Sequence, residues 1–95
     1  MNKKVYIKKI MQALDKYNKF RSPEATANLL KIKELDNKIE VIIKFEGVFC
    51  ETCGVNEYVY DLKYIFEDLN VKCEVKKIFE PENFENYRIA KFILL

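Results

Sequence analysis

The 95-residue chain contains no histidine and no tryptophan, and it has only two glycines and two prolines. Without histidine it lacks the side chain that most often acts as a general acid or base near neutral pH. Two glycines are too few for a glycine-rich phosphate-binding loop or for a long flexible linker. The sequence therefore gives little support for an enzyme, apart from the chemistry of its thiols.

Long apolar runs are also missing. No stretch approaches the roughly 20 residues that span a bilayer. The segment from Met1 to Lys9 is charged but has no continuous apolar core, so it does not resemble a secretion signal. We therefore expect a cytoplasmic protein without a membrane segment. Apolar residues make up 49% of the chain and charged residues 34%, which is typical of one globular domain covering residues 1–95.

The charges are unevenly placed, although the net charge is only +2. Residues 1–21 carry six lysines and one arginine against Asp15. Between Glu46 and Asp68 there are six acids against Lys63. A basic leading segment and an acidic middle could attract each other, within one chain or between two chains.

Periodicity predicts a leading helix over residues 3–20. Its apolar residues recur at spacings of three and four and form one stripe, made of Ile7, Ile10, Met11, Leu14 and Tyr17. Ser22, Pro23 and Glu24 suit the start of a helix, so a second, short helix is expected from Pro23 to about Asn28.

The rest of the chain predicts four strands and one further helix. Alternation predicts strands over 29–35 and 38–47, joined by a tight turn at Asp36 and Asn37, which tolerate left-handed conformations. A helix is expected over 56–69, ended by a left-handed Asn70. Strands over 71–79 and 85–95 follow, and the last is apolar on both faces, as in a central strand.

This order predicts an α+β fold, an αββαββ two-layer sandwich with a four-stranded, mostly antiparallel sheet and helices on one face. It resembles a ferredoxin-like fold whose last strand has been joined by a hairpin to its first. The resemblance implies that the strands lie in the order third, fourth, second, first across the sheet, with the helix over 56–69 crossing from the second to the third strand.

The most specific motif is the thiol pair Cys50 and Cys53 in Phe-Cys-Glu-Thr-Cys-Gly. Two intervening residues allow both sulfurs to reach one metal ion or each other. Residues 39–79 locally resemble glutaredoxins, with strand, Cys-x-x-Cys, helix and strand. That resemblance implies thiol–disulfide exchange, with Cys50 attacking and Cys53 resolving, whereas the acidic residues nearby oppose it by disfavouring a thiolate.

Two other interpretations of the pair stay open. A closed zinc site needs four ligands, so Cys50 and Cys53 could hold zinc if two chains each supplied both thiolates, as in a homodimer. Alternatively, Cys50 and Cys53 could form a disulfide, or stay as inert thiols, and serve only the structure of their loop. The third cysteine, Cys73, alternates with Val71 and Val75 and is expected in the core.

The second candidate site is the basic leading helix. It could bind a nucleic acid or a protein partner through its cationic side chains, namely Lys4, Lys8, Lys9, Lys16, Lys19 and Arg21. Sheets of ferredoxin-like folds can bind RNA through exposed aromatic side chains, and the candidates for such a role are Tyr60, Tyr64 and Tyr87.

The strings Arg-Ser-Pro-Glu-Ala (residues 21–25) and Phe-Glu-Gly-x-Phe-Cys (residues 45–50) resemble a small family of uncharacterised archaeal proteins, and that resemblance implies no function. Abundant lysine, glutamate and isoleucine suggest a thermophile. Two hypotheses follow from the sequence. One is a metal-binding or redox-responsive protein that acts through Cys50 and Cys53. The other is a non-catalytic interaction module that uses the basic helix or the open face of the sheet.

Overall fold

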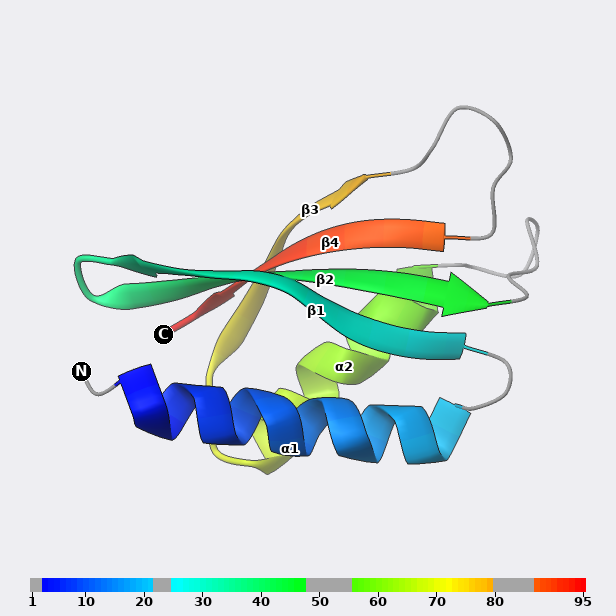
Figure 1. Ribbon diagram of the computed structural model, residues 1–95, viewed down its shortest axis with the longest axis horizontal. Coiled ribbons are helices and arrows are strands. Elements are labelled where there is room, and N and C mark those ends of the chain that lie inside the picture. Colours follow the sequence, from blue (N-terminus) through cyan, green and yellow to red (C-terminus); the bar gives the residue numbers. More distant parts are fainter. Residues whose placement is uncertain (1–2, 22–24, 48–55, 80–86) are drawn as a thin grey trace.

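Six elements follow one another in the order helix, strand, strand, helix, strand, strand (Figure 1). The computed structural model describes residues 3–21, 25–47, 56–79 and 87–95. The elements are α1 (Lys3–Arg21), β1 (Ala25–Leu35), β2 (Lys38–Gly47), α2 (Asn56–Asp68), β3 (Cys73–Phe79) and β4 (Tyr87–Leu94).

The four strands form one sheet in the order β1-β2-β4-β3, and every neighbouring pair is antiparallel. Both helices lie on the same side of this sheet, below it in Figure 1. The predicted αββαββ sandwich and its strand order are therefore confirmed. The carboxyl-terminal strand β4 lies between β2 and β3, and its Ile93, on the face away from the helices, is 6% exposed. Its predicted central position explains why it is apolar on both faces.

The first strand is longer than the sequence predicted. Residues 25–28 were expected to be helical, but they belong to β1, which pairs with β2 from Ala25 opposite Gly47. A helix there would leave the last part of β2 without a partner on this side. The carboxamide of Asn18 also holds this part of β1, because it accepts a hydrogen bond from the Ala27 N–H (2.7 Å) and donates one to the Ala27 carbonyl (3.2 Å).

The hairpin turn at Asp36 and Asn37 is confirmed, since Leu35 lies opposite Lys38. Neither turn residue has a positive φ, so the left-handed conformation expected there is absent from this described turn. The pairing with β2 is shifted between Leu29 and Lys31, where a β-bulge leaves Leu30 about half exposed.

The buried face of α1 is rotated relative to the predicted stripe. Four of its side chains are buried against the sheet: Ile10, Ala13, Leu14 and Tyr17. Ile7 and Met11 were expected in the core but are 37% and 53% exposed. Ala13 belongs to the buried face instead, and Met11 lies on the side of the helix toward β1, where it lines a groove with Ala27 and Leu29.

The end of α2 follows the prediction. Asn70 has a φ of 64°, in the left-handed region, and the Val71 N–H bonds to the Phe66 carbonyl at 2.9 Å. These features form a Schellman motif, in which a left-handed residue satisfies the last carbonyls of a helix. Val71 is buried, so the chain leaves the helix toward the core and enters β3.

The core lies between the helices and the sheet. Its largest members form a chain of aromatic contacts, in which Tyr17 meets Phe45 at 5.5 Å, Phe45 meets Phe92 at 6.2 Å and Phe92 meets Phe66 at 6.1 Å between ring centroids. Contacts of this tilted or edge-on kind add to the energy of burial. Within the described ranges, neither helix is both long and apolar enough to cross a membrane.

Candidate functional site

The predicted thiol site, Cys50 and Cys53, lies outside the described residues. The third cysteine is described and its predicted core position is confirmed, because Cys73 is buried at the start of β3. Burial raises the pKa of the Cys73 thiol from its ordinary 9.0 to about 12. Cys73 therefore behaves as a small apolar residue of the core, and its thiol is held in the neutral form that neither attacks a disulfide nor binds a metal.

The basic residues of α1 do not form one cationic face. Lys9 donates a hydrogen bond to the Leu69 carbonyl (3.2 Å), and Arg21 forms an ion pair with Asp61. These two cations bind α2, so the attraction expected between the basic and acidic segments occurs within one chain. The Lys9 contact also places a positive charge at the carboxyl end of α2, where the helix dipole favours it.

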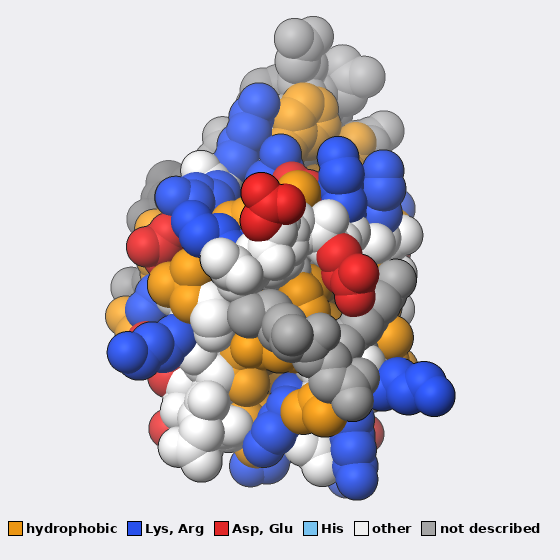
Figure 2. Space-filling model, turned by 90° about the vertical axis from the view of Figure 1, so that its left-hand side faces the viewer, with side chains coloured by type: hydrophobic (Ala, Val, Ile, Leu, Met, Phe, Trp, Pro, Cys, Tyr) orange, Lys and Arg blue, Asp and Glu red, His pale blue; other side chains and the backbone are white. Residues whose placement is uncertain are grey.

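The other four candidate residues of α1 are exposed. Lys19 pairs with Asp15 at 3.1 Å, one turn earlier, and Lys16 lines a groove between the two helices. Lys4 and Lys8 are exposed near the amino end of the helix. Figure 2 looks at the end of the molecule where that part of α1 and the β1–β2 hairpin lie, and basic side chains are spread around this end with acidic ones among them.

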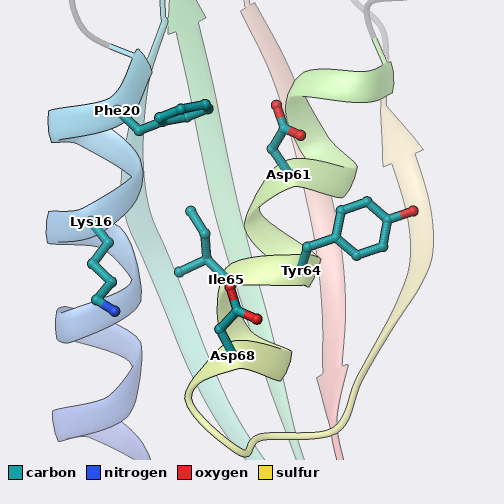
Figure 3. A pocket seen from close by; sticks show the side chains of 6 residues that line it. All are labelled: Lys16, Phe20, Asp61, Tyr64, Ile65 and Asp68. Carbon is teal, nitrogen blue, oxygen red and sulfur yellow. The ribbon is translucent and has the colours of Figure 1, made fainter.

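The groove between the helices, called the helix groove below, is about 300 Å³ in volume and is lined by Lys16, Phe20, Asp61, Tyr64, Ile65 and Asp68. Figure 3 shows Phe20 pointing from α1 toward α2, and Ile65 pointing from α2 toward α1. Phe20 is 71% exposed and Tyr64 is 57% exposed. The Arg21 guanidinium lies over the Phe20 ring at 5.1 Å while it pairs with Asp61, so one side chain fixes both walls at this end of the groove.

A second surface is the face of the sheet that is turned away from the helices, called the open face below. No helix or strand among the described residues covers it. The register places the following side chains on it: Thr26, Asn28, Lys31 and Lys33 of β1; Glu40, Ile42, Lys44 and Glu46 of β2; Tyr87, Ile89, Lys91 and Ile93 of β4; and Glu74, Lys77 and Phe79 of β3.

The open face has an apolar centre and a basic margin. Ile42, Ile89 and Ile93 lie on the central strands β2 and β4, and they are partly or fully buried. Glu40 pairs with Lys91 at 2.9 Å, and this bond, together with the nearby Lys33 and Lys31, lowers the pKa of Glu40 below 4.5. One carboxylate is therefore surrounded by three lysines at this part of the face.

Three lysines of the open face are available for a partner. Lys31, Lys33 and Lys77 form no ion pair with an acid of the described chain. Lys77 also lies directly opposite Lys91 in the register of β3 and β4. Glu40 already pairs with Lys91, so Lys77 is the lysine of these two that an anion could pair with.

Two aromatic side chains lie at one end of the open face. Tyr87 is partly exposed, and the Lys44 ammonium lies 4.9 Å above its ring. Phe79 is 49% exposed and is opposite Ile89, two residues along β4 from Tyr87. Of the three tyrosines suggested by the sequence, only Tyr87 is on the sheet, whereas Tyr60 and Tyr64 are on α2.

Sequence reasoning missed Phe79 because the register of β3 is shifted between Val75 and Lys77. The alternation that begins at Cys73 and Val75 would place residue 79 in the core. The extra residue at the bulge reverses the two faces, so Ile78 packs on the core and Phe79 faces outward. In the ranges that the structure describes, no group of three or more acidic or cysteine side chains is placed to hold a metal ion.

Comparisons with known proteins bear on the fold alone. No protein-family model matches the chain, and no curated protein matches it at a significant level. Among solved structures, the chain is similar to the crystal structure of the periplasmic domain of XcpY, with a TM-score of 0.59. The match covers 90% of this chain and 95% of that one, at 4% sequence identity. The two proteins thus share an architecture.

Proposed function

We propose that the chain is a non-catalytic interaction module and that its open face binds a polyanion, with single-stranded nucleic acid as the best-suited member of that class. The observation that supports this most is the composition of the open face. Three lysines that form no ion pair within the described chain, Lys31, Lys33 and Lys77, share this face with two exposed or partly exposed aromatic rings, and Lys77 is two residues from one of them, Phe79. Lysines neutralise phosphates, and aromatic rings stack on bases whatever their sequence.

The basic helix is a weaker candidate for the same role. Lys9 and Arg21 already bind α2, and Lys19 already pairs with Asp15. A polyanion on α1 would compete with these contacts, whereas Lys31, Lys33 and Lys77 on the open face form no ion pair with the described residues that it would have to displace.

The test compares two double substitutions with the same change in charge. Lys31→Glu with Lys33→Glu alters the open face, and Lys8→Glu with Lys19→Glu alters the outer side of α1. Binding of a single-stranded oligonucleotide is measured against salt concentration by fluorescence anisotropy. If both lysines of the open face contact phosphates, the slope of log K against log salt should fall by about 1.4 for the first variant. The second should change the slope much less.

The aromatic contribution is tested separately with Tyr87→Ser and Phe79→Ser. Each should weaken oligonucleotide binding by about 1–3 kcal/mol if its ring stacks on a base, while retention on heparin, which has no bases, should stay the same. The proposal is wrong if the protein binds neither heparin nor oligonucleotide, or if both double variants weaken binding equally.

A second candidate function rests on the thiols, and the position of Cys73 favours one form of it. Because Cys73 is buried in the core, Cys50 and Cys53 are the cysteines left for a metal. A closed four-thiolate site would then need both thiolates from each of two chains, as in a zinc-bridged homodimer.

Metal analysis of protein purified without oxygen tests this candidate. One zinc ion per two chains, lost in Cys50→Ser but kept in Cys73→Val, would support the shared site. Three reactive thiols in unfolded protein, with no bound metal and no disulfide in the native form, would remove both the metal and the disulfide hypotheses. The cytoplasmic location and the archaeal relationship expected from the sequence stay predictions.

A further inference from the structure

The helix groove has the properties of an interface that lacks its partner. Among the side chains of the two helices that the structure describes, Phe20 and Tyr64 are the most exposed aromatic ones, and both line this groove. Large exposed aromatic residues beside a groove are typical of protein contact surfaces, where such residues provide much of the binding energy.

The charges around the groove identify the partner. The sequence of α1 carries six lysines and one arginine against Asp15, whereas α2 carries four acids against Lys63. The two helices lie side by side in Figure 3, with Lys16 on the α1 wall of the groove and Asp68 on the α2 wall. A partner that presents an acid opposite α1 and a cation opposite α2 would be complementary, and a second copy of the chain turned by a two-fold rotation presents them in that order.

We propose that a second copy of this chain binds the helix groove in a symmetric dimer, with the two-fold axis running along the groove between the two helices. This rotation places α1 of each copy against α2 of the partner subunit. It keeps the height of each residue along the axis unchanged. Residues that lie level with each other on the two helices of one copy therefore meet across the interface.

Lys16 and Asp68 are the pair that this arrangement brings together. Figure 3 shows the Lys16 ammonium on α1 and the Asp68 carboxylate on α2 at a similar height along the groove. Neither side chain forms an ion pair with another residue of the described chain. In the symmetric dimer each Lys16 would meet the partner's Asp68, which gives two equivalent ion pairs at the edge of an aromatic contact.

Phe20 supplies the apolar part of the contact. Its ring is held by Arg21 and projects over the groove, above Ile65 on the opposite wall. Because the rotation keeps heights, the two Phe20 rings would meet each other at the two-fold axis, whereas each Tyr64 ring, which points away from α1 in Figure 3, would lie at the outer edge of the contact. Burial of exposed aromatic surface is the main source of favourable energy in this arrangement.

Exchange of the paired charges tests the proposal without any unknown partner. The molar mass of the untagged protein, kept reduced, is measured by light scattering over a range of concentrations. Lys16→Glu and Asp68→Lys should each raise the dimer dissociation constant by about tenfold or more, because each places like charges at both symmetric contacts. An equimolar mixture of the two variants should form a heterodimer of near wild-type stability, since both contacts then join opposite charges.

Two controls keep the test specific. Lys33→Glu changes the charge by the same amount as Lys16→Glu but lies on the open face, so it should leave the dimer intact. Phe20→Ser should weaken the dimer while the circular dichroism spectrum stays unchanged. A protein that is monomeric at every concentration reached, or a dimer that Cys50→Ser abolishes and Lys16→Glu leaves intact, would overturn the proposal. Neither result would affect the polyanion test, because a monomer can also bind an oligonucleotide through its open face.

Discussion

The reactivity of Cys73 gives a quantitative test of its place in the core. Its thiol is buried at the start of β3, and burial raises its pKa from 9.0 to about 12. At a pH below both values, each unit of pKa lowers the thiolate fraction about tenfold, so three units lower it about a thousandfold. Because the thiolate is the attacking species, alkylation of Cys73 in the folded protein should be slower by at least this factor than in the unfolded protein.

The assay uses a chain with Cys50→Ser and Cys53→Ser, in which Cys73 is the remaining thiol. Alkylation by iodoacetamide is followed by mass spectrometry with and without denaturant. Native Cys73 that reacts within about tenfold of the unfolded rate would show that its thiol is accessible and ionised, and it would return Cys73 to the set of candidate metal ligands and redox residues.

The same burial predicts how stability depends on pH. The unfolded thiol ionises near 9.0 and the folded thiol only near about 12, so between these values the unfolded state loses a proton that the folded state keeps. The free energy of unfolding should therefore be fully retained below pH 9 and should fall as the pH rises above it, by up to about 1.4 kcal/mol per pH unit from this group. Replacement by valine should make the decline less steep, as measured by urea unfolding.

Three further predictions concern local contacts. Asn18→Ala should lower the free energy of unfolding by about 1–2 kcal/mol, because it leaves the Ala27 N–H and carbonyl without their partner; urea unfolding measures this, and a loss no greater than that of Gln12→Ala would contradict it. Asn70→Ala should cost about 1 kcal/mol, whereas Asn70→Gly should cost nothing, because only the first disfavours a φ of 64°; equal midpoints of thermal unfolding for these two variants would contradict the role given to the left-handed residue. The pKa of Glu40 should lie below 4.5 and should rise toward it in Lys91→Gln, so the stabilisation from this ion pair is lost as the pH falls through the lowered value; an NMR titration that finds the same Glu40 pKa in both proteins would contradict this.

The order of the elements and of the strands could be predicted because the alternation within β2 and the apolar character of the last strand indicate the same arrangement. Ile39, Val41, Ile43 and Phe45 alternate without interruption, and all four are buried on one face of β2. The doubly apolar end of the chain could only be accommodated in the middle of a sheet, which fixed β4 between its neighbours. Given these two central strands, few topologies of an αββαββ chain remain.

The errors share one physical cause, which is that tertiary contacts overrode local preference. Ser22, Pro23 and Glu24 do suit the start of a helix, yet the pairing partner offered by β2 and the hydrogen bonds from Asn18 favour a strand from Ala25 onward. The bulges at Leu30 and near Lys76 could not be read from alternation, because each adds a residue that reverses the faces of its strand. The bulge near Lys76 affected the candidate sites most, because it places Phe79 on the open face, where uninterrupted alternation would have placed it in the core.

The two proposed surfaces lie on opposite sides of the molecule, and this makes their effects separable. If the helix layers of two copies pair, the two open faces point away from each other. A short oligonucleotide can then occupy only one face, whereas a long one can wrap around the dimer and bind both, with affinity raised on the order of a hundredfold by the second contact. Lys16→Glu should therefore weaken binding of a long oligonucleotide much more than that of a short one. An equimolar mixture of Lys16→Glu and Asp68→Lys should restore the higher affinity for the long oligonucleotide. If the ratio of long to short affinities is the same in the variant, in the mixture and in the wild type, then the two surfaces do not act together.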